Sequence, residues 1–404
     1  MAQLPAEGRF RVAEPSRVVP KLLDHLARRE PLRAETCASV PAGHYTSRKH
    51  LQVELDTVLR RWPQLVGLSC ELPEPGSRIV RDDMRVPVVV TRDALGEVHA
   101  LVNVCRHRGA RVAEADGTSR RLTCPYHAWS YDLDGALAAV PDAPSFPGVA
   151  PGACRLPTLP VIEWGGTVWV VPEPDGPAPA TMPPEALGPM SDDLLAYGLD
   201  EFQHWRRHRF DLQLNWKLVV DTFLEPYHFA SLHGRSVGPI FVSNLCAADR
   251  FGSHIREVLP RRSIADLAGL PEADWEVVSH SAIVNVLFPN VVAVMQVDHL
   301  ETWRVYPRGN EPGRSICELD FYIPGGRVTE SAQRHWESNW ELTIRTVLQE
   351  DFAMMAGVQR NLECGQLDHL TFGRNEPALA MYHQALAENC NMPDSQETSS
   401  HHSL

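Results

Sequence analysis

The chain has 404 residues, of which 44% are hydrophobic and 22% charged, and its formal net charge is −13. This composition is typical of a globular protein with room for two cores, and an acidic chain without a Lys/Arg run is not expected to bind nucleic acid. No segment reaches the roughly 18 consecutive apolar residues of a membrane span and the N-terminus lacks the apolar core of a signal peptide, so we expect a soluble, cytoplasmic protein that does not bind membranes.

Two helices are predicted at the start of the chain, over residues 17–30 and 44–62, because apolar residues recur there at helical spacing. Short β-rich runs follow from about 63 to 172, separated by Gly, Pro and Asp, and "LDG" within them is typical of a hairpin turn. This pattern predicts a small antiparallel β domain. The Pro-rich residues 172–189 predict a linker.

The second half of the chain predicts another sheet and a long helix. A strand is expected at "HWRRHRFDLQL", a helix at about 215–225, long strands in "SAIVNVLFPNVVAVMQVDHLETWRVYP" and "SICELDFYIP", and a helix from Thr329 to about 360. We therefore predict a helical segment at 1–44, a β domain at 45–172, a linker at 173–190, a second domain at 191–390 and a disordered tail at 391–404.

The first candidate metal site is a pair of cysteine and histidine motifs, Cys105-x-His107 and Cys124-x-x-His127, separated by sixteen residues. Thiolate sulfur suits zinc or iron–sulfur clusters. Zinc fingers typically place a cysteine pair before a histidine pair, whereas here each half supplies one of each. That arrangement is typical of a Rieske two-iron cluster, in which two cysteines bind one iron and two histidines bind the other. A zinc site and unligated core residues are the alternatives.

The second candidate site lies in "NWKLVVDTFLEPYHFASLH", residues 215–233. On a helix Asp221, Glu225 and His228 would share one face, and Pro226 should break that helix. A bend there could bring His228 and His233 to one point. Two histidines and one carboxylate form the facial triad that binds non-haem Fe(II) and leaves positions open for oxygen.

The third ligand of such a triad is predicted to be Asp351. It falls on the apolar stripe of the last long helix, whereas its neighbour Glu350 lies off that stripe. A carboxylate that faces a core should be paired or bound to metal. Glu350 and Asp221 are competing candidates, and Asp221 could instead orient a ligand histidine. Each of these histidines and carboxylates could also be an ordinary core or surface residue.

Three segments resemble ring-hydroxylating Rieske oxygenases. Residues 103–129 resemble their Rieske domain, and lack the extra disulfide cysteines of respiratory Rieske proteins, because Ala110 and Tyr126 stand at those places. "NWKLVVDTFLEPYH" with its following histidine, and "QEDFAMMAGVQ" around Asp351, resemble the parts of the catalytic domain that carry the mononuclear iron ligands. The resemblance extends from about residue 45 to 360.

The resemblance implies an α+β chain, with an all-β Rieske [2Fe–2S] domain before a catalytic domain whose antiparallel sheet wraps on helices (helix-grip, START-like). It implies two cofactors, a Rieske [2Fe–2S] cluster and mononuclear Fe(II). The implied ligands are Cys105, His107, Cys124 and His127 for the cluster, and His228, His233 and Asp351 for the iron. Glu225 matches the acid that bridges the iron site to the cluster histidine of a neighbouring subunit. Many members have Asp at that place, whereas some, including carnitine-type monooxygenases, have Glu.

The implied function is that of a terminal oxygenase component that activates O2 and hydroxylates an aromatic or other hydrophobic small molecule. The chain lacks a G-x-G-x-x-G dinucleotide fingerprint, so electrons should come from a separate NAD(P)H-dependent reductase or ferredoxin. The family implies a homotrimeric ring, with or without a small β subunit. Apolar residues between about 235 and 300 are expected to line the pocket.

Three other functions are compatible with the motifs. One is a monooxygenase or demethylase that acts on a quaternary ammonium compound of the carnitine or betaine kind, or on a methoxy compound; Glu225 favours the quaternary amine. The second is a Rieske electron-transfer protein without oxygenase activity, which would leave the whole second domain unexplained. The third is a zinc-stabilised binding protein.

Overall fold

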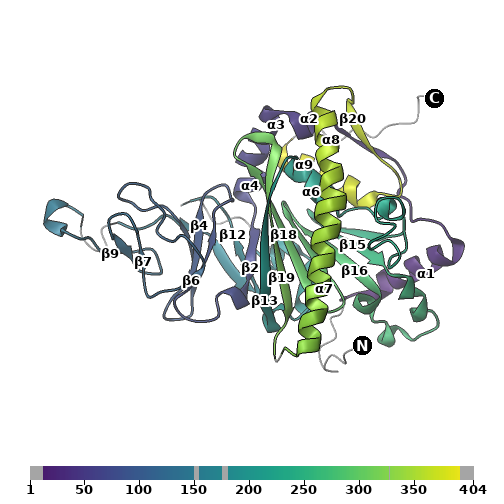
Figure 1. The fold of residues 1–404 in the computed structure, drawn as a ribbon, viewed down its shortest axis with the longest axis horizontal. Helices are drawn as coiled ribbons and strands as arrows, with labels where there is room; N and C mark the ends of the chain where they lie inside the picture. Colours follow the sequence, from purple (N-terminus) through teal and green to yellow (C-terminus); the bar gives the residue numbers. More distant parts are fainter. Residues whose placement is uncertain (1–11, 150–153, 175–180, 327, 392–404) are drawn as a thin grey trace. The chain divides into compact units, whose positions relative to one another are not determined.

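The structure is a computed structural model that describes residues 12–149, 154–174, 181–326 and 328–391. The disordered tail predicted from the sequence lies outside the described residues from 392 onwards. The chain forms two compact units, a smaller one made of Leu55–Ala186 with Leu199–His204, and a larger one made of the remaining residues (Figure 1). Among the described residues no helix is long and apolar enough to cross a bilayer.

Short strands are the main regular elements of the smaller unit, as the sequence predicts. A five-stranded sheet has the order β10-β5-β4-β3-β6, and two three-stranded sheets have the orders β11-β12-β2 and β7-β8-β9. The bounds are β2 Gln64–Leu68, β3 Ser77–Arg81, β4 Val88–Arg92, β5 Val98–Val102, β6 Gly117–Thr118, β7 Leu122–Thr123, β8 Ser130–Tyr131, β9 Leu137–Ala139, β10 Thr158–Leu159, β11 Val161–Trp164 and β12 Thr167–Val170.

The predicted "LDG" hairpin turn joins β8 to β9. Gly135 has φ 91°, and a Cβ atom there would lie 2.8 Å from the side chain of Leu101. The backbone conformation therefore favours glycine, and a larger residue would also have to displace the end of the Leu101 side chain.

The larger unit contains a seven-stranded sheet with the order β13-β19-β18-β17-β16-β15-β14. From β14 to β19 each strand pairs antiparallel with the next along the chain. The bounds are β13 Phe202–Leu212, β14 Ala247–Phe251, β15 His254–Pro260, β16 Ser281–Leu287, β17 Val291–Met295, β18 Leu300–Arg308 and β19 Glu311–Pro324. The strands predicted from "HWRRHRFDLQL" and the two later segments are confirmed.

One long helical run lies across this sheet (Figure 1). It comprises α7 (Glu330–Thr346), a π-helical turn η10 (Val347–Phe352) and α8 (Ala353–Glu363). Trp336 of α7 packs on Phe321 and Ile323 of β19, so aromatic and branched side chains bury the helix against the strand. The predicted helix from Thr329 to about 360 is confirmed, but its π-helical turn was not predicted.

The remaining helices depart from the sequence prediction in length. The helix expected at 17–30 is α1 (Val19–Arg28), whereas the one expected at 44–62 is divided into α2 (Gly43–Thr46), α3 (Arg48–Asp56) and α4 (Val58–Arg61). The helix expected at 215–225 is α6 and ends at Asp221. Elements that the sequence did not predict include α5 (Met190–Ala196), α9 (Pro377–Cys390), the strands β14 and β15, and the paired strands β1 (Ala38–Pro41) and β20 (His369–Phe372).

Candidate metal centres and substrate pocket

The two cysteine loops of the smaller unit adopt the same turn. In each loop the cysteine N–H donates to the carbonyl five residues later, at 2.7 Å for Cys105 and 2.9 Å for Cys124. The N–H four residues after the cysteine donates back to the cysteine carbonyl, at 3.0 and 2.9 Å. That position has a positive φ in both loops, 76° at Gly109 and 57° at Ala128. Glycine adopts this conformation readily, whereas alanine rarely does, so the sequence gave no signal for the turn at Ala128.

The side chains of the two loops fit a two-iron cluster. Cys105 and Cys124 are buried, and the rings of His107 and His127 lie 4.5 Å apart between centroids. The Nδ1 atom of His107 is buried without a hydrogen-bond partner among the described residues, which is costly unless the nitrogen binds a metal. The Tyr131 hydroxyl lies 3.3 Å from the Cys105 sulfur, and burial raises the pKa of this thiol. A thiolate here therefore needs a neighbouring positive charge.

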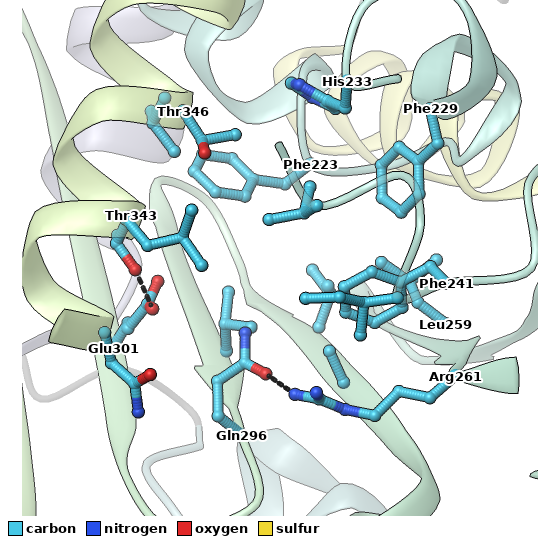
Figure 2. A pocket seen from close by; sticks show the side chains of 18 of the residues that line it. Phe223, Phe229, His233, Phe241, Leu259, Arg261, Gln296, Glu301, Thr343 and Thr346 are labelled. Carbon is cyan, nitrogen blue, oxygen red and sulfur yellow. Dashed lines mark hydrogen bonds between the residues drawn. The ribbon is translucent and has the colours of Figure 1, made fainter. Parts of the chain in front are cut away.

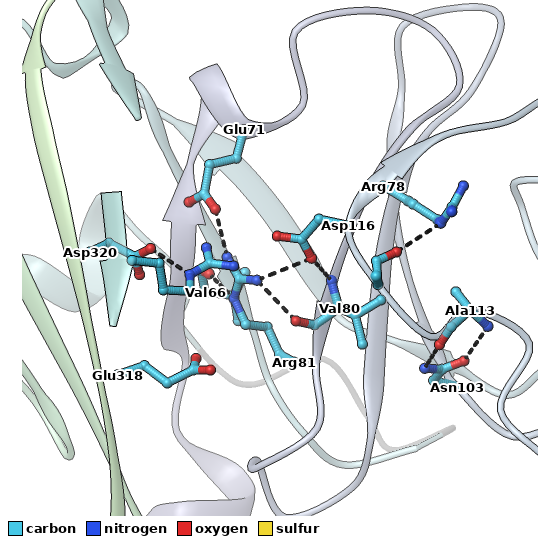
Figure 3. Close-up of polar contacts among 12 residues, drawn as sticks. Val66, Glu71, Arg78, Val80, Arg81, Asn103, Ala113, Asp116, Glu318 and Asp320 are labelled. Atoms are coloured by element: carbon cyan, nitrogen blue, oxygen red, sulfur yellow. Dashed lines mark hydrogen bonds and ion pairs between the residues drawn. The ribbon is translucent and has the colours of Figure 1, made fainter. Parts of the chain in front are cut away.

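Asn103 ties the first loop to the strand that precedes it, and the sequence reasoning missed it. This residue is fully buried at the end of β5. Its side-chain nitrogen donates to the Ala113 carbonyl at 2.7 Å, and its oxygen accepts the N–H groups of Val112 and Ala113 at 3.0 Å each (Figure 3). The loop that carries Cys105 and His107 is thereby closed at its base by side-chain bonds as well as by backbone bonds.

The second site gathers three side chains from separate segments of the larger unit. The His228 and His233 Nε2 atoms lie 3.0 Å apart. The Asp351 Oδ1 atom lies 3.0 Å from the His233 Nε2 atom and 3.5 Å from that of His228. A first-row metal ion about 2.0–2.2 Å from each donor would hold donors at right angles about 3 Å apart. The donor set and its spacing therefore fit one ion.

The backbone reaches this arrangement differently from the prediction. We expected Asp221, Glu225 and His228 on one helix face, but α6 ends at Asp221, and His228 lies in a separate 3-10 turn, Tyr227–Ala230. We predicted the break at Pro226, but the helix already ends five residues earlier, and Pro226 instead precedes the turn that carries His228.

Gly238 and the π-helical turn complete the framework. A Cβ atom at Gly238 would lie 2.6 Å from the His233 carbonyl oxygen and 2.7 Å from that of Phe229, so only glycine allows the chain to fold back against His233. Asp351, which is buried, lies in the π-helical turn η10. Such turns are frequent at functional sites.

Two carboxylates orient the histidine rings. The Nδ1 atom of His228 hydrogen-bonds Glu225, whose other oxygen accepts the His228 backbone N–H at 3.0 Å. The Nδ1 atom of His233 lies 2.6 Å from Glu350, which also accepts the Ser236 hydroxyl at 2.7 Å. Each carboxylate holds the proton of its histidine at Nδ1. The lone pair of each Nε2 atom then faces Asp351, as binding of a shared metal ion requires.

Asp221 does not make the contact that we predicted. It accepts a hydrogen bond from the Tyr45 hydroxyl at 2.8 Å and lies 2.8 Å from His383 Nε2. Glu350, which the sequence presented only as a competitor for the metal, takes the orienting role instead. The two adjacent acidic residues Glu350 and Asp351 could have indicated this role. One of such a pair can bind the metal while the other orients a ligand histidine.

The electrostatic environment of the triad favours a cation. Burial alone would lower the pKa of His228, but its hydrogen bonds to Asp351 and Glu225 outweigh burial and raise the pKa to about 9. The pKa of His233 is also raised, because Asp351 and Glu350 outweigh its burial. The negative charge of these carboxylates, which raises the pKa of both histidines, also attracts a metal ion.

A cavity of about 340 Å³ opens on the triad. This volume lies within the range of small-molecule pockets, roughly 300–1,000 Å³. Its walls combine apolar and polar side chains (Figure 2). The apolar lining includes Phe223, Phe229, Val237, Ile240, Phe241, Leu259, Ala282, Val284, Val294 and Val347, and the polar lining includes Arg261, Gln296, Asp298, His299, Glu301 and His335.

The expectation that residues between about 235 and 300 line the pocket is confirmed. We expected only apolar side chains there, but polar ones also line the pocket. Arg261 follows β15 and Gln296 follows β17. Because both strands run antiparallel to β16, their carboxyl ends lie at the same edge of the sheet. The sequence pattern gave no indication that these two polar residues would meet.

The two donor sets, one in each unit, define an oxygenase chain with an iron–sulfur cluster and a mononuclear iron. Comparison with protein families agrees: residues 62–160 match the Rieske [2Fe-2S] domain, and residues 199–392 match the ring hydroxylating alpha subunit (catalytic domain). The chain belongs to the family of Rieske oxygenase alpha subunits, whose cofactors are a Rieske [2Fe–2S] cluster and mononuclear iron. The sequence-based recognition is confirmed.

Similar proteins include chloroplastic choline monooxygenase of Spinacia oleracea, 25% identical over 81% of this chain and 73% of that protein. The glycine betaine monooxygenase oxygenase subunit of Chromohalobacter salexigens is 30% identical over 59% of this chain and 51% of that protein. The quaternary ammonium Rieske monooxygenase CntA with L-carnitine has a similar fold, with a TM-score of 0.71 and 18% identity over 87% of this chain and 96% of CntA. Naphthalene 1,2-dioxygenase from Rhodococcus sp. has a TM-score of 0.68 and 18% identity over 93% of this chain and 99% of that chain.

Proposed function

We propose that this chain is the terminal oxygenase of a system that oxidises a quaternary ammonium compound. The observation that carries the proposal is the pocket, in which phenylalanine rings stand beside a triad supported by carboxylates. Curated relatives of similar sequence are named for choline and for glycine betaine. The aromatic substrate expected from the sequence is therefore replaced by the quaternary ammonium alternative.

Phenylalanine rings and carboxylates together suit a cation that cannot donate hydrogen bonds. The Phe229 ring lies 5.5 Å from the Phe241 ring and 5.5 Å from the His233 ring, between centroids, so the aromatic wall reaches the triad. A desolvated cation over such rings gains about 2 kcal/mol. Asp351 lines the pocket, and Glu225 and Glu350 lie behind the two histidines. Bound Fe(II) would neutralise two of these three negative charges, so about one net negative charge would remain near the triad to favour a cation.

The residue assignments made from the sequence form part of the proposal. Cys105, His107, Cys124 and His127 hold the cluster, and His228, His233 and Asp351 hold the mononuclear iron. When bound, these groups supply electrons one at a time and a reduced metal for oxygen chemistry. Glu225 and Glu350 keep the histidine protons at Nδ1.

Glu225 is also assigned as the bridge to the cluster histidine of a neighbouring subunit, which requires a ring of subunits, as in a homotrimer. Electrons would come from a separate NAD(P)H-dependent reductase or ferredoxin.

The net reaction balances with one molecule of O2. One oxygen atom enters a C–H bond of the substrate and the other leaves as water, with two electrons from the reductase and two protons from solvent. Insertion at an N-methyl group gives a hydroxymethyl ammonium compound, which releases formaldehyde, a proton and a tertiary amine. The phenylalanine side chains keep bulk water from the reacting carbon.

The test is oxygen uptake by the purified oxygenase with a generic ferredoxin–reductase pair. Choline, glycine betaine and carnitine are compared with benzoate, naphthalene and methoxybenzoate, and 3,3-dimethylbutan-1-ol serves as the neutral isostere of choline. We expect at least one quaternary ammonium compound to give oxidised product in proportion to the oxygen consumed, and its neutral isostere to give none. Product from an aromatic compound, with none from the cations, would contradict the proposal.

A further inference from the structure

The pocket contains a guanidinium group that forms no ion pair with any of the residues that the structure describes. Arg261 donates from Nη2 to the side-chain oxygen of Gln296 at 2.7 Å, and its Nε atom is buried without a hydrogen-bond partner among the described residues. Its guanidinium also lies 5.2 Å from the centroid of the Phe241 ring. Figure 2 shows Arg261 and Gln296 at the end of the lining opposite His233, with Phe229 and Phe241 along the wall between.

The carboxylates that line the same pocket are already engaged. Glu301 accepts the Thr343 hydroxyl at 2.9 Å and the Trp303 indole N–H at 3.1 Å. Asp298 lies 2.9 Å from His299 Nδ1 and 2.7 Å from His335 Nε2. Burial lowers the pKa of Arg261 and the charge of Asp298 only partly offsets it. This half-buried cation is therefore partly desolvated and forms no ion pair within the described part of the chain. Such a group is unfavourable by itself and is stabilised by an anionic ligand.

Gln296 offers a second donor at the same place. An arginine side chain has no acceptor, so the amide oxygen of Gln296 must face Arg261 and the amide nitrogen faces elsewhere. Figure 2 shows that nitrogen directed toward the interior of the drawn lining. The free guanidinium N–H groups and the amide NH2 group together match the two oxygens of a carboxylate, which arginine binds bidentately.

We propose that Arg261 and Gln296 bind a carboxylate of the substrate, and that the substrate is therefore a zwitterion with a quaternary ammonium group at one end and a carboxylate at the other. This inference rests on the proposed function and narrows it from quaternary ammonium compounds in general to betaines. The carboxylate end lies at Arg261, and the cationic end faces the Phe229 ring and the anionic surroundings of His228 and His233. The pocket is thus charged to orient a molecular dipole, which presents an N-methyl group to the triad.

Four ligands of nearly the same shape separate the two charges. Glycine betaine carries both, choline carries only the cation, 3,3-dimethylbutanoate carries only the carboxylate, and 3,3-dimethylbutan-1-ol carries neither. Their affinities for the anaerobic holoenzyme are measured by titration calorimetry, with wild-type protein, Arg261→Gln and Arg262→Gln. Arg262 is the matched control, because it is the exposed neighbour with the same charge. Thermal unfolding shows whether each variant is folded.

We expect wild-type protein to bind glycine betaine best and each singly charged ligand better than the alcohol. Arg261→Gln should lower the affinity for glycine betaine and for 3,3-dimethylbutanoate at least about 30-fold, as expected for the loss of a buried charge pair. The affinity for choline should change by no more than about twofold. Arg262→Gln should change none of the four. Arg261→Gln loses only the hydrogen bond to Gln296 and the contact with the Phe241 ring, so the variant should remain folded.

The outcomes separate the inference from the proposed function. If choline binds wild-type protein as tightly as glycine betaine, or if Arg261→Gln weakens both equally, the carboxylate site is refuted while the quaternary ammonium proposal stands. If glycine betaine and 3,3-dimethylbutanoate bind equally tightly, and Arg261→Gln weakens the binding of both, the carboxylate site is supported. The proposed preference for a quaternary ammonium group is then refuted. If none of the four binds and carnitine does not bind either, both are refuted. The four wild-type affinities test the inference even if Arg261→Gln does not fold.

Discussion

Glu350 provides the sharpest test of how the mononuclear site is built. Its carboxylate lies 2.6 Å from His233 Nδ1 and accepts the Ser236 hydroxyl at 2.7 Å. It therefore fixes both the tautomer and the direction of the His233 ring. Replacing it should weaken iron binding although Glu350 itself is not a ligand, and two substitutions divide the effect into its parts.

The magnitude follows from what each substitution removes. Glu350→Gln keeps an oxygen that can accept from Nδ1–H but loses the negative charge, so a charge-assisted bond becomes a neutral one of about half the strength. Glu350→Ala removes the acceptor as well. Loss of such a support typically lowers metal affinity 10- to 100-fold. We expect the affinity for Fe(II) to fall about tenfold in Glu350→Gln and about 100-fold in Glu350→Ala. These factors correspond to roughly 1.4 and 2.7 kcal/mol of binding free energy.

The assay is an anaerobic Fe(II) titration of protein that keeps its cluster, followed by competition with a chelator. Glu341→Gln, an exposed glutamate on α7, is the matched control and should bind iron as wild-type protein does. The visible spectrum of the cluster should be the same in all variants. Wild-type iron affinity in Glu350→Ala would refute the orienting role, and a parallel loss in Glu341→Gln would show that helix charge alone is responsible.

Three further predictions concern buried or bridging carboxylates. Glu225→Gln should slow oxidation of the reduced cluster by the iron site at least about tenfold in single-turnover stopped-flow experiments, without changing cluster reduction by dithionite; wild-type rates would exclude the bridge. Asp221→Ala should lower the free energy of unfolding by about 3 kcal/mol, because Tyr45 and His383 lose a buried partner, while iron per folded chain stays at the wild-type value; iron loss would restore our original assignment. Burial raises the pKa of Glu257 from 4.5 to about 8, so between these pH values the unfolded chain releases a proton that the folded chain keeps, and stability falls as pH rises. Glu257→Gln, which stays uncharged, should therefore unfold near the wild-type temperature at pH 5 and be about 2–4 kcal/mol more stable at pH 8; equal differences at both pH values would contradict this.

The proposed metal ligands could be located from the sequence because their chemistry is local. A cysteine and a histidine two or three residues apart lie on one turn, and the structure repeats that turn around Cys105 and Cys124. Asp351 was located by the cost of burying a carboxylate on an apolar helix face, and it is indeed buried. Leu348 precedes Asp351 by three residues on the same apolar stripe but is 38% exposed, because the π-helical turn changes the number of residues per turn within 347–352.

Other features of the site depend on contacts between distant segments, which periodicity does not report. Arg261 and Gln296 meet only because two strands end at the same edge of the sheet, and Gly238 is required by the carbonyl groups of His233 and Phe229. Asp221 was misassigned because we assumed that α6 continues to Glu225, which would have placed Asp221 beside His228. The early end of α6 instead turns Asp221 toward Tyr45 and His383.

Anomalous diffraction at the iron absorption edge, from crystals grown without oxygen and loaded with Fe(II), tests the central claim most directly. One iron should lie within about 2.0–2.2 Å of His228 Nε2, His233 Nε2 and Asp351 Oδ1. Two more irons should lie close together, between the sulfur atoms of Cys105 and Cys124 on one side and the rings of His107 and His127 on the other. Anomalous density at the cluster alone, or a single iron bound away from His228, His233 and Asp351, would contradict the account.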